Sequence, residues 1–300
     1  MSEHNTSSLV LRAKGLTLDF SAGLTHPAHV MGILNVTPDS FSDGGDFINV
    51  DRAVARASEM ISEGAAIIDV GGASSRPKGN DYGEGASVVA PSDEIDRVVP
   101  VIRTISRKHP DIWISIDTFR TQVAIEALKA GAHIINDITG LRVDPALANL
   151  AAAEDAPLVL MHSVGEPGSM PHAAEYEDVV LDVRTSLLES ISIAGDRGVK
   201  QLILDPGFGF GKSVNDNLRL ISTINELAEL GFPVMVGVSR KSSIGAILGS
   251  SEEPVSIENR IFGSLGVTAV AFLRGARIIR THDVGPTVEM LRAMTATLNA

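Results

Sequence analysis

The sequence predicts an α/β fold, a closed (β/α)8 barrel of the TIM type, and two observations carry that prediction. Eight short apolar runs recur along the 300 residues, and segments with helical periodicity lie between them. The runs are almost continuously hydrophobic, as is typical of parallel strands that are buried on both faces. Eight strand–helix alternations favour a closed barrel over an open sheet, because such a barrel takes about 250 residues.

The eight predicted strands share a high content of aliphatic and β-branched residues, and each ends in polar or glycine residues. In chain order they are HVMGILNV from His29, AIIDVGG from Ala66, WISIDT from Trp113, HIINDI from His133, PLVLMH from Pro157, QLILDP from Gln201, PVMVGVS from Pro233 and RIIRTH from Arg277.

Helices are predicted between these strands, among them 51–64, 92–109 and 121–132. Two of them begin with a residue that often caps a helix and end near glycine: Asp51 to Gly64, and Thr121 to Gly131. These start and stop signals agree with the strand positions on either side.

The ends and the irregular segments divide the chain. Residues 1–28 precede the first strand and contain GLTLDF, which predicts an N-terminal extension, either a hairpin or a cap over the bottom of the barrel. Residues 29–300 are predicted to be a single barrel domain, because no low-complexity linker or change in composition interrupts them. The long irregular stretch 73–91 follows the second strand, and a loop of that length in a compact domain favours a functional role.

Composition excludes several classes of protein. The net charge of −12 argues against general nucleic-acid binding. The absence of cysteine excludes disulfides, thiolate metal ligands and cysteine nucleophiles. Neither a signal peptide nor an apolar stretch of roughly 18 residues is evident, so we expect a cytoplasmic protein that does not enter membranes.

Polar residues gather where the predicted strands end, which in an α/β barrel is the catalytic face. A buried polar group without a partner costs about 1–3 kcal/mol, so a core built only for stability would not hold so many. Any single one of them could brace a loop, but the whole set predicts an active site. Its members are Asn35, Asp69, Asp117, Asn136, Asp137, His162, Asp205, Ser239, Arg240, Lys241, Arg280 and His282.

The glycine-rich segment LDPGFGFGKS (204–213) is not a phosphate-binding P-loop. That motif needs a glycine six residues before its lysine, and Pro206 stands there. We expect instead that its glycines let the backbone approach a flat ligand, with Phe208 or Phe210 as the apolar contact.

The last two strand ends carry the cations of the predicted site. VSRKSSIG (238–245) follows the seventh strand, and Arg280 and His282 end the eighth, where barrels often bind phosphate. Asn35 and the following loop, with Asp39 and Asp43, offer oxygen ligands for Mg²⁺. Few protein ligands are needed when phosphates and water supply the rest. By themselves His162 and His282 could equally be ordinary hydrogen-bonded residues.

Several of these motifs, in this order, resemble the dihydropteroate synthase family. The resemblance runs from about residue 10 to the C-terminus. Its blocks are MGILNVTPDSFSDGG (31–45), IIDVGGASSRP (67–77), SIDT (115–118), INDITG (135–140), LDPGFGFGK (204–212), GVSRKS (237–242) and IIRTHDV (278–284).

The resemblance implies a Mg²⁺-dependent transferase that condenses 6-hydroxymethyl-7,8-dihydropterin pyrophosphate with p-aminobenzoate to give 7,8-dihydropteroate and pyrophosphate. By the same resemblance the catalytic residues are Asp117, Lys241, Arg280 and His282, and Asn35 is the metal ligand. The pterin would be held by Asp117, Asn136, Met161, Asp205 and Lys241, the pyrophosphate by Arg280 and His282, and p-aminobenzoate by Ser75, Arg76, Pro77, Phe210, Lys241 and Ser242.

The family mechanism is dissociative, so the C–O bond breaks before the amine attacks. A carboxylate such as Asp117 would stabilise the cationic pterin, and no covalent nucleophile is needed. The loops 36–48 and 73–91 would close over the reaction and exclude water. A homodimer is implied as well, with the apolar segment 267–276 as its interface or, equally, as a core face.

The chain departs from the family pattern near the site. Ala73 stands where the family has glutamate, and Ser75 where it has threonine. The second loop is longer than usual, and Ser163-Val164 replaces a common Met-Gln. These changes could alter the response to sulfonamides, for which the family is a target. Two alternatives stay open: a non-catalytic pterin-binding paralogue, and a corrinoid-linked pterin methyltransferase.

Overall fold

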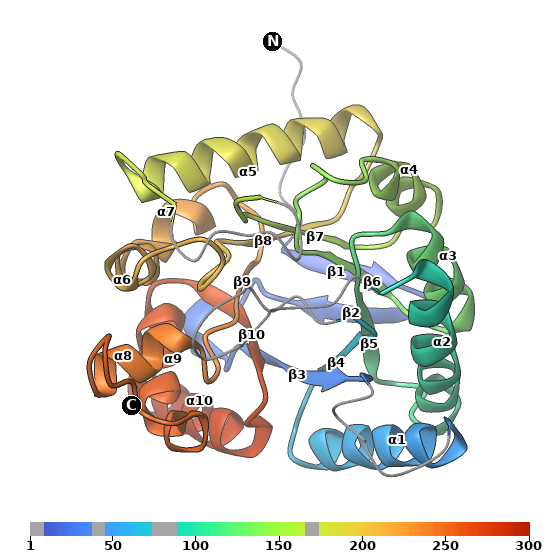
Figure 1. The fold of residues 1–300 in the computed structure, drawn as a ribbon, viewed down its shortest axis with the longest axis horizontal. Helices are drawn as coiled ribbons and strands as arrows, with labels where there is room; N and C mark the ends of the chain where they lie inside the picture. Colours follow the sequence, from blue (N-terminus) through green and yellow to red (C-terminus); the bar gives the residue numbers. More distant parts are fainter. Residues whose placement is uncertain (1–8, 38–45, 74–88, 166–173) are drawn as a thin grey trace.

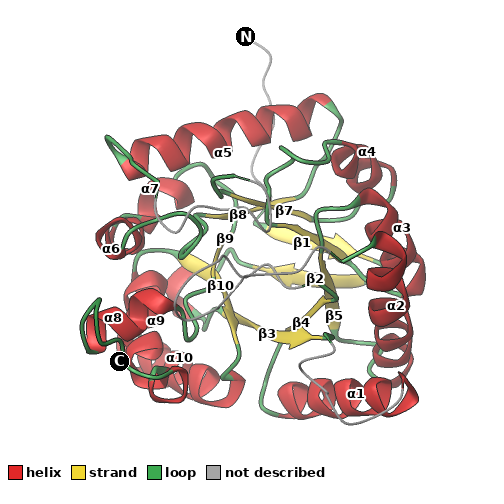
Figure 2. Cartoon of the chain, viewed as in Figure 1, coloured by secondary structure: helices red, strands yellow, loops and turns green. Residues whose placement is uncertain are grey.

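The fold is a closed barrel of eight parallel strands with helices around its outside (Figures 1 and 2). A computed structural model describes residues 9–37, 46–73, 89–165 and 174–300. The last strand pairs with the first as well as with its predecessor, which closes the barrel and confirms the predicted fold class. The strands are β3 (His29–Asn35), β4 (Ile67–Gly71), β5 (Trp113–Asp117), β6 (Ile134–Asp137), β7 (Leu158–Met161), β8 (Leu202–Asp205), β9 (Val234–Val236) and β10 (Ala276–Thr281).

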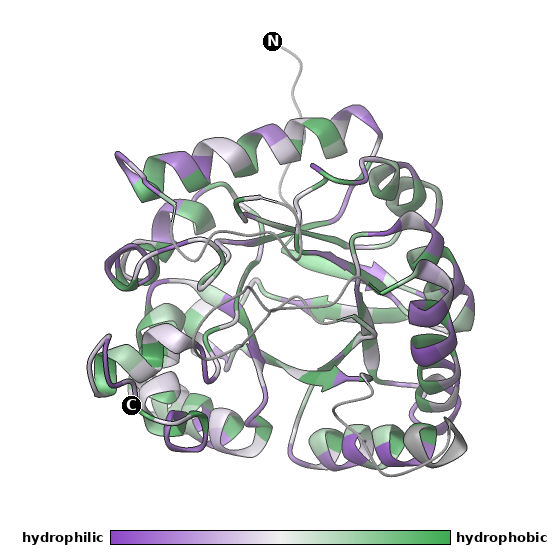
Figure 3. Cartoon of the chain, viewed as in Figure 1, coloured by the Kyte–Doolittle hydropathy of each residue, from purple (hydrophilic) through white to green (hydrophobic). Residues whose placement is uncertain are grey.

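The helices pack their apolar faces against the outer side of the barrel wall, where hydropathy is highest (Figure 3). None of the helices in the described ranges is both long and apolar enough to cross a membrane. They are α1 (Asp46–Ser62), α2 (Pro91–Lys108), α3 (Thr121–Ala130), α4 (Ala146–Ala153), α5 (Val179–Asp196), α6 (Val214–Ser222), α7 (Ile224–Ala228), α8 (Ser242–Leu248), α9 (Ile261–Leu273) and α10 (Val284–Leu298).

The predicted helix boundaries were right for α3 and wrong for α1. Helix α3 begins at Thr121, where Asp144 accepts the backbone N–H of Thr121 at 2.8 Å, and Gly131 ends it at φ 123°. Helix α1 begins at Asp46, so Asp51 lies inside the helix and does not cap it. The helix extends further because Val50 packs against the same core as Val54 one turn later.

An N-terminal hairpin covers the bottom of the barrel, as predicted. Its strands β1 (Val10–Ala13) and β2 (Leu16–Asp19) pair antiparallel. The Gln201 side chain binds the hairpin's edge, accepting from Arg12 N at 2.7 Å and donating to Arg12 O at 2.9 Å. The division into an extension, 1–28, and a domain, 29–300, stays a prediction. The hairpin residues Leu11, Leu18 and Phe20 form one buried cluster with Met31, Ile67, Trp113, Ile134, Val159, Ile203, Met235 and Ile278.

The strand residues of that cluster form the lowest layer inside the barrel. Their positions determine which residues face the interior in the next layer. Side chains alternate along a strand, so the residue two positions on faces the interior one layer higher. Register pairs some of these residues directly, Asp69 with Ser115 and Met161 with Asp205. Elsewhere it is offset by two residues, so Ser115 pairs with Ile134 and Arg280 with Met31. We call this second set the polar layer: Ile33, Asp69, Ser115, Asn136, Met161, Asp205, Gly237 and Arg280.

Candidate active site

One arginine of the polar layer joins the buried carboxylate of Asp69 to that of Asp117, which lies one layer higher on β5 and is 12% exposed. Arg280 Nε donates to Asp69 Oδ2 and Arg280 Nη2 donates to Asp117 Oδ2, both at 2.7 Å. Asn136 Nδ2 donates to the same Asp69 oxygen at 3.2 Å. Asp69 is completely buried, so this network lies in a low-dielectric interior where an ion pair is strong and an unpaired charge is costly.

Three buried polar atoms of this layer have no hydrogen-bond partner within the described part of the chain. They are Asp69 Oδ1, Ser115 Oγ and Asn136 Oδ1, from three adjacent strands. Leaving such a group unsatisfied costs about 1–3 kcal/mol, so folded proteins usually pair it with a ligand or an ordered water. Their grouping marks the interior of the barrel as a place for a polar ligand.

Burial shifts the pKa values of three ionisable groups of the site so that the neutral form of each is favoured. It raises the pKa of Asp117 to about 7, although the charge of Arg280 opposes the shift. It also lowers the pKa of Lys241 to about 7, against the effect of Asp205. Asp205 is fully buried and its own pKa is raised for the same reason. A carboxyl and an ammonium group whose pKa values both lie near 7 in one site are typical of a catalytic centre.

Lys241 reaches the site from the N-cap of α8 and binds the glycine-rich loop. Its Nζ donates to the Phe208 carbonyl and lies 4.4 Å from the centroid of the Phe210 ring. The Phe208 ring is buried in the outer core, whereas Phe210 packs with Met161, Ile138 and Phe119. Of the two phenylalanines considered, Phe210 therefore lies on the ligand side.

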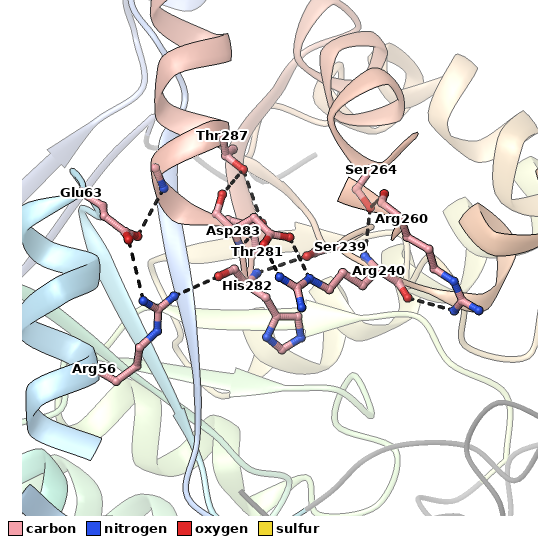
Figure 4. Close-up of polar contacts among 11 residues, drawn as sticks. Arg56, Glu63, Ser239, Arg240, Arg260, Ser264, Thr281, His282, Asp283 and Thr287 are labelled. Carbon is pink, nitrogen blue, oxygen red and sulfur yellow. Dashed lines mark hydrogen bonds and ion pairs between the residues drawn. The ribbon is translucent and has the colours of Figure 1, made fainter. Parts of the chain in front are cut away.

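His282 is held by contacts to its backbone (Figure 4). Its N–H donates to Ser239 Oγ at 3.2 Å, and its carbonyl accepts from Arg56 at 3.2 Å. Arg240 binds the next residue, Asp283, through two guanidinium nitrogens. The charge of Arg240 is thus paired with that of Asp283, and its role as a cation for phosphate stays a prediction.

Asn35 lies above the polar layer in a position suited to a metal. A Cβ placed on Gly71 would lie 3.7 Å from Asn35 Oδ1 and 3.6 Å from Asp117 Cβ, so the missing side chain keeps this space open. In the described ranges no three His, Asp or Glu residues form a complete metal site. A single amide oxygen nonetheless fits Mg²⁺, which keeps water and phosphate as its other ligands. Asp39 and Asp43 lie outside the described residues.

The remaining predicted residues divide into three groups. Ser75, Arg76 and Pro77 lie outside the described residues, as do most of the loops 36–48 and 73–91. Asp137 braces its own loop by accepting from Thr139 and from the Leu141 N–H. His162 is buried, which lowers its pKa to about 2 and keeps the ring neutral.

The structure brings two further residues to the site. Ser115 lies in the polar layer, where alternation from Asp117 could have placed it. Lys212 is buried beside the glycine-rich loop and donates to three carbonyl oxygens. No sequence signal shows that arrangement, because its carbonyl partners include one from another strand end.

These features are typical of an enzyme that binds a flat, polar ligand. Two ionisable groups have pKa values near 7, buried polar atoms lack partners, and an apolar patch adjoins them. Residues 31–282 match the model of the pterin binding enzyme family. Dihydropteroate synthase of Escherichia coli strain K12 is 44% identical over 292 residues, which is 97% of each chain. That of Bacillus subtilis strain 168 is 43% identical over 272 residues, covering 90% of this chain and 88% of the relative.

Solved structures agree with these relatives. Xanthomonas albilineans dihydropteroate synthase with 4-aminobenzoic acid superposes with a TM-score of 0.86 at 40% identity, covering 98% of this chain and 100% of that one. The Yersinia pestis enzyme in a sulfonamide drug complex gives a TM-score of 0.85 at 42% identity, with 97% and 100% covered. The chain therefore belongs to the dihydropteroate synthase family of transferases.

Proposed function

We propose that this chain condenses 6-hydroxymethyl-7,8-dihydropterin pyrophosphate with p-aminobenzoate, releasing 7,8-dihydropteroate and pyrophosphate. The observation that carries the proposal is the Asp69–Arg280–Asp117 network inside the barrel. Further support comes from Xanthomonas albilineans dihydropteroate synthase in complex with 7,8-dihydropteroate, which superposes with a TM-score of 0.82 at 38% identity.

In the proposed complex the pterin occupies the polar layer. Carboxylates and an amide suit its donor-rich edge, and such a pattern discriminates strongly against a ring that lacks the donors. Met161 packs on the ring face. The binding groups are Asp117, Asn136, Asp205 and Lys241, two of which belong to the polar layer beside the unsatisfied atoms. Ser75, Arg76, Pro77, Phe210, Lys241 and Ser242 would line the p-aminobenzoate pocket.

The proposed mechanism is dissociative. Charged side chains of this protein stabilise both products of C–O cleavage, the cationic pterin and the pyrophosphate. As the C–O bond breaks, the pterin becomes cationic and ionised Asp117 stabilises it. Arg280 and His282 bind the departing pyrophosphate. Arg280 uses Nε and Nη2 for Asp69 and Asp117, which leaves its third nitrogen for a phosphate oxygen. The neutral amine then attacks, and no covalent enzyme intermediate forms.

When bound, Mg²⁺ would neutralise charge on the pyrophosphate, and Asn35 is the proposed protein ligand. We expect Asn35→Ala to raise the Mg²⁺ concentration needed for half-maximal rate by about 10- to 100-fold, as for other changes at metal sites. Calorimetric titration of Mg²⁺ into the protein with pyrophosphate should show a corresponding decrease in the affinity for Mg²⁺. Asn225→Ala, on the exposed side of α7, is the matched control. An unchanged Mg²⁺ requirement in Asn35→Ala would remove Asn35 from the metal site.

We also propose a homodimer that forms through α9. This helix exposes Phe262 (82%), Val270 and Leu273, and large apolar side chains exposed together often mark an interface. Phe262→Asp is expected to halve the mass measured by light scattering, because a buried unpaired charge opposes association. Leu181→Asp, at an exposed site on α5, should leave the mass unchanged. A wild-type protein with the mass of one 31.6 kDa chain would contradict the dimer.

The proposal places the enzyme in the cytoplasm, with small molecules as its ligands and neither nucleic acid nor membranes as partners. The net charge of −12 and the lack of cysteine agree with that setting. It also makes the chain a sulfonamide target. Ala73 and the long second loop are the places where its response could differ from that of relatives.

The function is tested by mixing the purified protein with the pterin pyrophosphate, p-aminobenzoate and Mg²⁺. Formation of dihydropteroate and pyrophosphate that needs all three components supports the synthase. Binding of the pterin pyrophosphate without turnover would favour the non-catalytic paralogue. Transfer of a methyl group from a methylated pterin to a corrinoid protein would favour the methyltransferase.

A further inference from the structure

The glycine-rich loop after β8 wraps around one buried ammonium group. Lys212 Nζ donates to the carbonyl oxygens of Gly207 at 2.9 Å, Phe210 at 3.0 Å and His162 at 3.3 Å. Lys212 is only 3% exposed, and within the described ranges it forms no ion pair. A P-loop turns its amides toward an anion, whereas this loop turns its carbonyls toward a cation.

Glycine is required for this arrangement. Gly207, Gly209 and Gly211 have φ values of 69°, 81° and 69°, in the left-handed region that other residues rarely adopt. A Cβ on Gly207 would lie 1.8 Å from the His162 oxygen, and one on Gly209 would lie 2.7 Å from Lys241 Cδ. The loop can therefore close on Lys212 and meet Lys241 only because these side chains are missing.

The loop's other backbone groups also have specific partners. Asp205 Oδ1 accepts from Gly207 N and Asn217 Oδ1 accepts from Gly209 N, both at 2.7 Å. The Phe208 carbonyl then faces Lys241. Two lysines thus bind different carbonyls of one loop. Lys212 donates to those of Gly207 and Phe210, and Lys241 donates to that of Phe208.

We propose that Lys212 is a positioning residue whose ammonium charge holds this loop, so that the Phe208 carbonyl orients Lys241 and Phe210 packs beside Met161. This inference rests on the proposed function. Burial lowers the pKa of Lys212 to about 7 and thus disfavours its charged form, while Asp205 favours that form. A buried charge without an ion pair is costly, and a purely structural role would be served as well by a neutral donor of the same size.

The absence of cysteine allows a direct test of the charge. A Lys212→Cys chain has a single thiol. Alkylated while unfolded with 2-bromoethylamine and then refolded, it carries an ammonium on a side chain of lysine length. Alkylated with 2-bromoethanol, it carries a neutral hydroxyl at the same distance. The two proteins differ in one terminal group.

We expect the aminoethylated protein to recover most of the wild-type kcat/KM. The hydroxyethylated protein should stay about 100-fold lower, because a displaced catalytic group commonly costs that much. Hydrogen exchange at the Gly209 and Phe210 amides should be faster in the hydroxyethylated protein. Equal activity and equal exchange in the two proteins would overturn the proposal, since filling the space would then suffice.

Three controls keep the test decisive. Wild-type protein taken through the same unfolding and alkylation reports on the proposed function separately, and the exchange measurement needs no turnover. Lys129→Cys, at an exposed residue of α3, should have the same kcat/KM after alkylation with either reagent. If alkylated Lys212→Cys fails to refold, Lys212→Arg and Lys212→Gln repeat the comparison in chains folded during synthesis. Arginine should then retain more activity than glutamine, and the reverse order would overturn the proposal.

Discussion

Replacing Arg280 by methionine is expected to lower kcat/KM by about 10²- to 10³-fold, the usual effect of removing one preorganised charge from a reacting group. Methionine keeps most of the side-chain volume, so the loss reports on the guanidinium. Steady-state kinetics with both substrates would measure it. The affinity for pyrophosphate should fall in parallel, since Arg280 is the proposed contact for the leaving group.

The same variant should be less stable by about 3–5 kcal/mol, because Asp69 and Asp117 lose the cation between them. Urea unfolding at pH 7 would measure the loss. It should shrink at lower pH, where the unpaired carboxyls become protonated and neutral. Adding Asp69→Asn to Arg280→Met should restore part of the stability without restoring activity, which separates the two effects.

Arg219→Met is the control for the loss of an ion pair as such. It breaks the exposed pair with Asp178 and should change stability by about 0–1 kcal/mol and leave activity unchanged. If Arg280→Met were as stable and as active as this control, the central network would have neither a catalytic nor a structural role.

Replacing Asp117 by asparagine is expected to lower kcat by about 10²- to 10³-fold, because an amide cannot stabilise the cationic pterin as a carboxylate can. The change keeps size and hydrogen-bonding capacity, and KM for the pterin pyrophosphate should move much less than kcat. Asp144→Asn, near the start of α3, is the matched control, since within the described ranges that carboxylate accepts from the Thr121 and Ala146 N–H groups and from no group of the site. Equal kcat values for wild type and Asp117→Asn would exclude the proposed electrostatic role.

The pH dependence gives this prediction a second measurement. Burial raises the pKa of Asp117 and lowers that of Lys241, each to about 7, so the rate should rise as Asp117 ionises and fall as Lys241 loses its proton. Because the groups interact, the apparent values belong to the cluster. Asp117→Asn should lose the rising limb and keep the falling one. A rising limb that persists would assign it to another group.

The free energy of unfolding of the wild type should also depend on pH through Asp117. The folded-state pKa of Asp117 lies above its ordinary value of 3.8, so the folded protein binds the extra proton between these two values. Its contribution to the free energy of unfolding therefore falls as the pH rises from about 4 to about 7. Denaturant titrations of wild type and Asp117→Asn over that range would show this difference.

The sequence by itself determined the barrel and the face that holds the site. Continuous apolar runs located all eight strands, and each polar strand end proved to be close to the mouth. Alternation explains why. Once residues such as Ile67 and Trp113 fill the lowest layer, Asp69 and Ser115 must face the interior one layer higher. The hairpin was also predictable, because GLTLDF can bury its apolar side only against the barrel's open end.

Only the tertiary structure decided which polar groups are partners. Arg280 and Asp69 are 211 positions apart, and Arg240 and Asp283 are 43 positions apart. The start of α1 also depended on packing, since Val50 packs against the core. Lys212 gives a further case, because the His162 carbonyl, 50 positions away, joins two carbonyls of its own loop around the ammonium group. Periodicity is a property of neighbouring residues, whereas a hydrogen bond depends on a distance that only barrel closure sets.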